Sequence, residues 1–242
     1  LAPIGVFALI ARVFATEGLD ALRPMLFYLV VVIGVLLVHA FVVYPLLLKG
    51  LSGLNPKRFL VKIWPAQVFA FSTASSAATI PVTLGVVEKR MGVKNSVASF
   101  TVPLGATINM DGTAIMQGVA TVFIAQAYGV QLGVGEYLMV ILTATLASIG
   151  TAGVPGAGLI MLAMVLKQAG LPVEGIAIVY GVDRLLDMTR TAVNITGDAV
   201  VTCIVAKSEK QMDIEVFNTP DSQLDGAAAE PDDRDRATAG KD

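Results

Sequence analysis

Residues 183–198 read D-R-L-L-D-M-T-R-T-A-V-N-I-T-G-D, within a segment that is otherwise apolar enough to lie in a membrane. The polar residues recur at steps of three or four, which places them on one face of a helix. This polar stripe consists of Asp183, Asp187, Arg190, Thr191, Asn194 and Asp198. An ionisable group at membrane depth costs about 2.5–3.5 kcal/mol on insertion scales, so such groups usually mark the path of a substrate or ion. One arginine cannot pair with three aspartates, which argues against a stripe that only holds helices together.

The composition around the stripe is that of an integral membrane protein. Of the 242 residues, 55% are hydrophobic and 15% are charged, and the mean hydropathy is +0.74, far above a soluble domain. Four segments without Asp, Glu, Lys or Arg are each long enough to cross the hydrocarbon core, which takes about 20 helical residues. They are residues 24–48, 63–87, 112–135 and 137–166. We therefore predict an all-α integral membrane fold.

Several other classes of function are disfavoured by the residues that the chain lacks. The single cysteine, Cys203, excludes an internal disulfide and a cysteine-built metal site. No basic cluster is interleaved with aromatic residues, so we expect no nucleic-acid partner. Ser75 and Ser76 have no histidine partner, and we expect no enzymatic activity. The single histidine, His39, lies in an apolar run, and we interpret it as a helix-packing residue with a hydrogen-bonded ring rather than a proton relay.

Two uncharged segments are broken at their centres by small and helix-disrupting residues. T-A-S-S-A-A-T-I-P (residues 73–81) interrupts the first, and G-T-A-G-V-P-G-A-G (residues 150–158) interrupts the second. Each predicts two half-helices that meet at a tip, as re-entrant hairpins at about 57–88 and 134–169. Irregular backbone at membrane depth is tolerated where it is buried in protein or lines a cavity. N-M-D-G-T (residues 109–113) similarly predicts an interrupted transmembrane helix.

The chain thus holds two consecutive units, residues 57–129 and 134–208, each with a broken hairpin followed by an interrupted or polar-striped helix. Discontinuous segments in corresponding positions point to the binding site of a secondary transporter. If the units begin on opposite sides of the membrane, one side receives most of the basic residues, namely Lys49, Lys57, Arg58, Lys62, Lys89, Arg90, Lys94, Lys207 and Lys210. The other side receives Arg23 and Lys167. The positive-inside rule then predicts inverted repeats, with the first hairpin entering from the cytoplasm.

The regions outside these units differ from them in composition. Residues 1–23 read as the end of an earlier helix and a loop, and the chain starts in apolar sequence, so we expect a C-terminal part of a longer protein. Residues 24–208 form the expected substrate- and ion-binding domain. Residues 209–242 hold ten of the nineteen acidic residues and few apolar ones. We predict that they form a disordered acidic cytoplasmic tail.

The stripe carries the groups that a dicarboxylic amino acid requires in a low-dielectric pocket. Arg190 offers a bidentate fork for the side-chain carboxylate, and Asp187 offers a counter-charge for the ammonium group. Asn194 and Thr191 supply neutral contacts. Asp198 and Asp111, with Asn109 and freed backbone carbonyls, form an all-oxygen set suited to Na⁺. The helix N-termini at the two tips can donate N–H groups to an anionic substrate.

These motifs resemble those of the glutamate/aspartate transporters, a family of sodium- or proton-coupled dicarboxylate/amino acid symporters. The resemblance covers nearly all of residues 1–208. It rests on the first tip (Ser75, Ser76, Thr79, Pro81), N-M-D-G-T, G-T-A-G-V-P-G-A-G and the polar stripe, in that order.

The resemblance implies a role for each matching residue. Arg190 would bind the substrate side-chain carboxylate, Asp187 the amino group, and Asn194 and Ser76 the α-carboxylate, while Asp183 would steady Arg190. The implied substrate-binding set is Ser75, Ser76, Thr113, Val154, Gly158, Asp187, Arg190, Thr191 and Asn194.

Three sodium sites are implied in the same way. The first combines the Asp198 side chain with backbone oxygens of Gly105, Asn109 and Asn194. The second uses backbone oxygens near Met110, those of Thr107, Ser148, Ile149 and Thr151. The third uses the side chains of Asn109 and Asp111, with further ligands from an earlier helix.

The family fold implies a homotrimer in the cell (inner) membrane, crossed many times, in which the transport domain slides against a scaffold as an elevator. Residues 134–169 would form the extracellular gate.

Three positions depart from relatives. Ala74 and Met188 stand where many relatives carry an arginine, and Gln117 stands where proton-coupled animal members have a glutamate, which favours pure sodium coupling.

The alternatives are a proton-coupled glutamate or C4-dicarboxylate symporter, a neutral amino acid symporter and, in a different class, an ion channel. The presence of both Asp187 and Arg190 favours L-aspartate or L-glutamate. Two re-entrant gates favour alternating access over a channel.

Overall fold

The computed structural model describes residues 22–220, and this part of the chain is helical, as predicted. Its regular structure contains one isolated antiparallel bridge, between Val93 and Met212, and otherwise only helices and turns. In chain order the elements are α2 (Leu22–Val38), η2 (His39–Val43), α3 (Tyr44–Ser52), α4 (Pro56–Thr73), α5 (Ser76–Gly85), η3 (Val86–Arg90), α6 (Asn95–Ile108), α7 (Asp111–Ala127), α8 (Val134–Ile149), α9 (Ala157–Gln168), η4 (Val173–Gly175), α10 (Ile176–Ser208) and α11 (Ile214–Asn218). The predictions for residues 1–21 and 221–242 lie outside the described residues.

The elements α2, η2 and α3 form one continuous helix that is long and apolar enough to cross a membrane. Residues 23–52 span 30 residues, with a mean hydropathy of 2.9 in the most apolar window. Every fourth residue along one face is buried, in the series Tyr28, Val32, Leu36, Ala40, Tyr44 and Leu48. Large apolar side chains on the other faces are exposed, among them Phe27 and Leu46. This pattern places one face against the protein and leaves the rest for an apolar environment.

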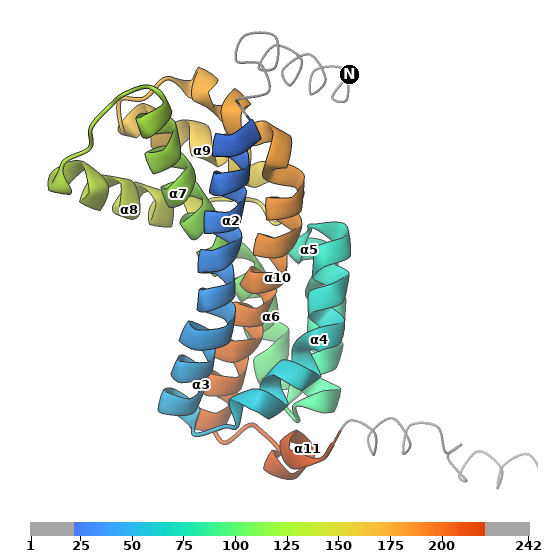
Figure 1. Cartoon of the computed structure of the whole chain (residues 1–242). Helices are drawn as coiled ribbons and strands as arrows, with labels where there is room; N and C mark the ends of the chain where they lie inside the picture. Colours follow the sequence, from blue (N-terminus) through green and yellow to red (C-terminus); the bar gives the residue numbers. More distant parts are fainter. Residues whose placement is uncertain (1–21, 221–242) are drawn as a thin grey trace, which may run out of the picture.

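The helix α10 forms the centre of the bundle. It spans 33 residues and contacts α2, α3, α4, α6 and α7. In Figure 1 it runs beside the long blue helix formed by α2 and α3, with α4 and α5 on one side. The polar stripe predicted from residues 183–198 therefore lies on the most enclosed helix of the described structure.

Two helical hairpins occur where the sequence predicts broken segments. In the first, α4 and α5 pack together and meet at Ala74, which adopts a left-handed conformation (φ 52°). Ser75 caps the N-terminus of α5, since its Oγ accepts a hydrogen bond from the Ala78 amide at 3.2 Å. In the second hairpin, α8 and α9 pack together and are joined by residues 150–156. The small and polar residues at each centre end one helix and start the next.

The tips of the two hairpins contact each other. The carbonyl oxygen of Gly153 accepts hydrogen bonds from the Ser75 hydroxyl at 2.8 Å and from the Ala77 amide at 3.1 Å. The predicted break in the helix between residues 95 and 129 is present, since α6 ends at Ile108 and α7 begins at Asp111. It lies nearby, because a Cβ atom at Gly153 would be 3.3 Å from the Ala106 carbonyl oxygen of α6. Three interruptions of the backbone therefore meet beside α10.

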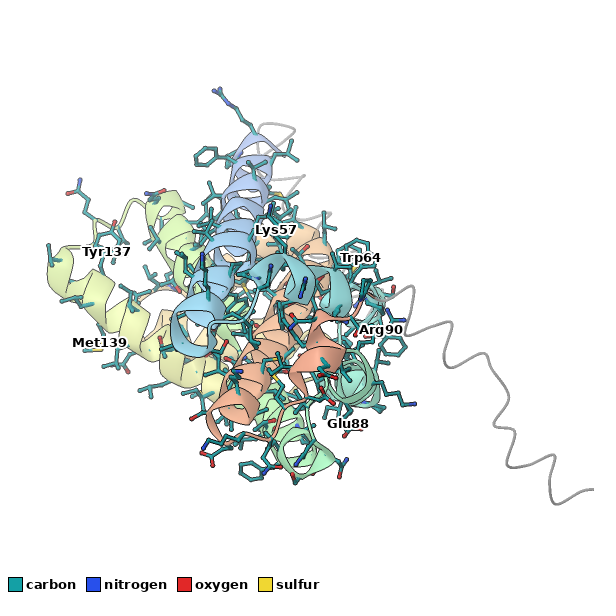
Figure 2. All side chains as sticks on the ribbon, turned by 90° about the horizontal axis from the view of Figure 1, so that it is seen from below. Lys57, Trp64, Glu88, Arg90, Tyr137 and Met139 are labelled. Carbon is teal, nitrogen blue, oxygen red and sulfur yellow. The ribbon has the colours of Figure 1, made fainter. Side chains whose placement is uncertain are left out.

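The helix α8 reaches away from the bundle and carries an exposed apolar surface. Figure 1 shows it extending to the side, and Figure 2 shows Tyr137 and Met139 on this outlying part. Val134, Leu138 and Leu146 are each more than 60% exposed. This surface requires an apolar environment or a protein partner.

The boundary predicted at residue 208 for a disordered tail is too early. Residues 209–220 fold against the first hairpin, and Phe217 of α11 is 1% exposed. Asp213 caps α11, because its Oδ1 accepts hydrogen bonds from the amides of Glu215 and Val216. The prediction relied on the acidic composition of residues 209–242 as a whole, which does not reveal the buried Phe217 or the helix cap formed by Asp213.

Candidate functional site

The buried end of the polar stripe is organised by an ion pair between Asp187 and Arg190. Both side chains are about 4% exposed, and the Arg190 Nε and Nη2 atoms donate to Asp187 Oδ1 at 3.1 and 2.8 Å. The backbone amide of Gly156, at the second hairpin tip, donates to the other carboxylate oxygen at 2.8 Å. The tip is thereby held against α10.

Within the described residues no hydrogen bond joins Asp183 to Arg190, and the role that the resemblance implies for Asp183 stays a prediction. Within residues 22–220, the hydrogen bonds of Arg190 go to Asp187 and, at 3.4 Å, to the Thr113 hydroxyl. Asp183 lies one helical turn before Asp187 and is 7% exposed. The guanidinium is therefore steadied by Asp187 in this structure.

Gly158 allows the first turn of α9 to lie against the guanidinium. A Cβ atom at this position would overlap the Arg190 guanidinium group. The Gly158 carbonyl accepts a hydrogen bond from Gln117 Nε2 at 3.2 Å, and Gln117 is fully buried. Within the described residues the Gln117 Oε1 atom has no hydrogen-bond partner. The second hairpin thus covers the arginine directly.

Asn194 joins α10 to the start of α7. Its Nδ2 donates to the Thr113 hydroxyl at 3.2 Å, and its Oδ1 accepts from the Gly112 amide at 2.8 Å. Thr191 is also buried, but its hydroxyl donates to the Asp187 carbonyl of its own helix at 2.7 Å. These contacts bring the predicted residues of α7 and α10 together.

The hairpin tips supply the remaining predicted substrate contacts. Ser75 and Ser76 are buried at the first tip, beside Gly153. Val154 lies in the second tip with its side chain half exposed, and its amide donates to the Ala152 carbonyl at 2.8 Å. The tips thus form two walls of the site through backbone and small side chains.

The residues of the first implied sodium site lie together. Asn109 Nδ2 donates to Asp198 Oδ1 at 2.9 Å and approaches the Asn194 carbonyl at 3.4 Å. Gly105 lets α6 approach closely, because a Cβ atom there would lie 2.6 Å from Asp198 Oδ1. Asp198 is 2% exposed, so this carboxylate accepts the Asn109 hydrogen bond with little access to water.

The second implied sodium set is less closely gathered. Met110, Ser148 and Thr151 are buried, and the two hydroxyl groups donate to carbonyls of α8 itself, at 2.8 and 2.9 Å. Ile149 and Thr107 are exposed, and the Thr107 hydroxyl donates to Pro103. No hydrogen bond within residues 22–220 links Thr107 to residues 148–151.

Asp111, from the third implied set, contacts two residues whose roles the sequence did not reveal. Its Oδ2 atom lies 3.1 Å from His39 Nε2, and the Tyr44 hydroxyl donates to it at 3.2 Å. The contact with Asp111 satisfies the His39 ring, in agreement with the helix-packing residue that we inferred from the sequence, but the sequence did not identify the partner. The one available signal was the five-residue spacing of two polar rings in a single helix.

Comparison with known proteins identifies the family of this chain. The model of the sodium:dicarboxylate symporter family matches residues 1–208. The chain belongs to this family. An excitatory amino acid transporter of Caenorhabditis elegans is 43% identical over 205 residues, covering 84% of this chain and 41% of the relative. Excitatory amino acid transporter 3 of Mus musculus is 43% identical over 88% of this chain and 42% of the relative. Excitatory amino acid transporter 2 of Homo sapiens is 43% identical over 86% of this chain and 37% of the relative.

The chain therefore spans about two-fifths of the length of these relatives. The matching family is named for the symport of sodium and dicarboxylates, and these three relatives are named as excitatory amino acid transporters. The exposed apolar faces of α2, α3 and α8 agree with a membrane location.

Proposed function

We propose that this chain is the substrate- and ion-binding part of a symporter that moves L-aspartate or L-glutamate into the cell together with Na⁺. The observation that carries the proposal is the buried pair of Asp187 and Arg190 beneath the second hairpin tip. Breaking a buried pair by leaving one charge alone is strongly unfavourable. A ligand that enters here must therefore replace both partners at once.

An acidic amino acid meets this requirement. Its side-chain carboxylate can take the place of Asp187 at the guanidinium, and its ammonium group can take the place of Arg190 at the Asp187 carboxylate. Arginine favours a planar carboxylate because its donors form a fork. The α-carboxylate then finds neutral donors in Asn194 and at the first tip, near Ser76.

The proposed sodium ligands are those of the three sets described above. Asp198 carries the first, supported by its burial and by the Asn109 side-chain amide, which contacts both the Asp198 carboxylate and the Asn194 carbonyl oxygen. A cation there would balance a carboxylate that has no basic partner within the described residues. Family membership supports sodium as the co-transported ion, and coupling to protons is the alternative.

We propose that residues 24–208 move as a transport domain in which both hairpins are re-entrant and the two units are inverted. The contact between the tips supports this arrangement, because each hairpin reaches the centre of the bundle. The exposed face of α8 would slide against a scaffold from the rest of the protein, within a homotrimer. We place the protein in the cell (inner) membrane, with the basic end and the C-terminal segment in the cytoplasm. Lys57 and Arg90 lie near the base of the first hairpin, on the end seen in Figure 2.

The test is uptake by the full-length protein in liposomes, with labelled L-aspartate and L-glutamate under separate sodium and proton gradients. We expect saturable uptake driven by sodium. Arg190→Cys should abolish uptake of acidic substrates and admit serine or cysteine, because the pocket loses the guanidinium fork that binds a second carboxylate. Arg184→Cys is the matched control, since Arg184 is exposed on the same helix.

Each alternative gives a different result in this experiment. Uptake driven by a proton gradient alone identifies a proton-coupled symporter, and serine uptake by the unmodified protein identifies a neutral amino acid symporter. Conductance without saturable substrate dependence identifies a channel. Micromolar aspartate binding retained in Arg190→Cys overturns the assignment of the pocket.

A further inference from the structure

The long helix that begins at Leu22 contains a single π-helical turn, η2 (His39–Val43), and the two polar rings beside this turn both reach Asp111. His39 Nε2 lies 3.1 Å from Asp111 Oδ2, and the Tyr44 hydroxyl lies 3.2 Å from the same oxygen. The two rings also contact each other edge to face, with centroids 4.5 Å apart. Isolated π turns within α-helices are often found at functional sites.

The π turn explains how two residues five positions apart share one face. In an α-helix, with 3.6 residues per turn, the fifth residue lies roughly 140° around the axis from the first. A π turn closes hydrogen bonds over five residues and places residue 44 above residue 39. The backbone here follows this pattern, since the Tyr44 amide donates to the His39 carbonyl.

The Tyr44 ring has little freedom to move away. It is 3% exposed, and α10 approaches it closely at Gly197. A Cβ atom at Gly197 would overlap the Tyr44 hydroxyl and lie 2.5 Å from the Asn109 amide nitrogen. Tyr44 is therefore confined between its own helix, α10 and Asp111.

The chemistry of the contact fixes the direction of both hydrogen bonds. An ionised carboxylate only accepts, so His39 Nε2 and the Tyr44 hydroxyl are both donors. They use the same oxygen, Oδ2, whereas Oδ1 receives no hydrogen bond from residues 22–220. The Asp111 side chain is 39% exposed, so Oδ1 is accessible to a cation.

We propose that His39 and Tyr44 are positioning residues that hold the Asp111 carboxylate with one oxygen turned toward an alkali cation and thereby raise the sodium affinity of this site. The inference rests on the proposed function for the cation but not on the identity of the amino acid. Two fixed donors remove the rotational freedom of the carboxylate before the cation arrives. Neither residue needs to touch the cation.

The test uses the purified full-length protein and measures its melting temperature at increasing sodium concentrations, without an amino acid and with choline keeping the ionic strength constant. Binding to the folded state raises the melting temperature by mass action. We expect Tyr44→Phe to raise the half-stabilising sodium concentration by about tenfold, the size expected for one hydrogen bond to a charged group. Tyr28→Phe is the control, because it removes a phenol hydroxyl from a buried tyrosine of the same helix away from Asp111.

Two further variants distinguish positioning from general damage. His39→Leu should weaken sodium binding more than His39→Gln, because glutamine keeps an N–H donor. In an Asp111→Asn background, Tyr44→Phe should have no additional effect, since the carboxylate that it positions is gone. If Tyr44→Phe does not fold, the two His39 variants in both backgrounds give the same information.

An unchanged or lower half-stabilising sodium concentration in Tyr44→Phe overturns the proposal, since the donors would then be irrelevant to the cation or would compete with it. An equal shift in the Asp111→Asn background overturns it as well. If sodium stabilises the unmodified protein but neither aspartate nor glutamate is taken up, the proposed substrate fails while the positioning role stands. If sodium does not stabilise the protein at all, the positioning role fails.

Discussion

At the scale of single residues, the binding site depends on close approaches that only glycine permits. Gly158 lies against the Arg190 guanidinium, and Gly105 lies against the Asp198 carboxylate. In both places the backbone of one helix comes near a charged side chain of α10. The charged groups are thereby shielded from water while carbonyl oxygens and amide groups remain within reach.

The first prediction concerns Gly158. Gly158→Ala should weaken aspartate binding by more than about tenfold in the full-length protein. A methyl group there displaces the Arg190 guanidinium from the position in which it would bind the substrate carboxylate. Isothermal titration calorimetry with aspartate in sodium measures the effect. Gly118→Ala is the matched control, since a Cβ atom at this helical glycine meets no neighbour within 4 Å. Equal affinities in the two variants would contradict the assignment.

The second prediction concerns Asp198. Asp198→Asn should raise the sodium concentration needed for half-maximal aspartate binding by about tenfold or more, because the amide removes the buried charge that attracts the cation. The measurement is aspartate binding at a series of sodium concentrations. Glu88→Gln removes an acidic group that Figure 2 places at the surface and serves as the control. An unchanged sodium dependence in Asp198→Asn would rule out this sodium site.

At the scale of elements, α11 ties both arms of the first hairpin to the end of α10. Lys62 of α4 is 3% exposed, and its ammonium group donates to the Thr219 carbonyl at 2.9 Å. At the other arm, the Asp213 amide donates to the Gly92 carbonyl at 2.7 Å. Comparable ties at the base of the second hairpin are absent from the described residues. The first hairpin is therefore the more firmly anchored of the two, which agrees with a gating role for the second.

The third prediction tests this anchor. Phe217→Ala should lower the melting temperature of the full-length protein and expose residues 209–220 to limited proteolysis, because a buried Phe→Ala change costs about 3–5 kcal/mol. Glu215→Ala, at an exposed position of the same helix, should change neither property. A protease-resistant segment in Phe217→Ala would show that other contacts hold α11 in place.

At the scale of the whole molecule, the described bundle leaves apolar surface that its own helices do not cover. The exposed side chains of α8, including Leu138 and Ile141, project from an element that leaves the bundle (Figure 1). The relatives are more than twice as long as the matched region. The elevator motion that we propose requires a fixed partner against which this face can slide.

The fourth prediction follows from the need for a fixed partner against which α8 can slide. Residues 1–242 alone, reconstituted in liposomes, should show no sodium-driven aspartate uptake, whereas the full-length protein should show it. The physical reason is that alternating access needs two bodies that move relative to each other. Uptake by residues 1–242 above that of protein-free liposomes would refute the elevator proposal.

The sequence by itself determined the helical membrane fold, the positions of both hairpins and the break at residues 109–113. Its uncharged runs are long and its helix-breaking residues fall at their centres, so local physical chemistry decides these features. The same spacing also identified the buried face of α10 that carries Asp187 and Arg190.

Only the tertiary structure decided which groups meet. It paired Arg190 with Asp187 rather than Asp183, brought His39 and Tyr44 to Asp111, and folded Phe217 into the core. The first contact depends on a side-chain rotamer, the second on a π turn, and the third on how one segment packs against another. Such choices are made by packing between distant segments, and the periodicity of a single helix carries no information about them.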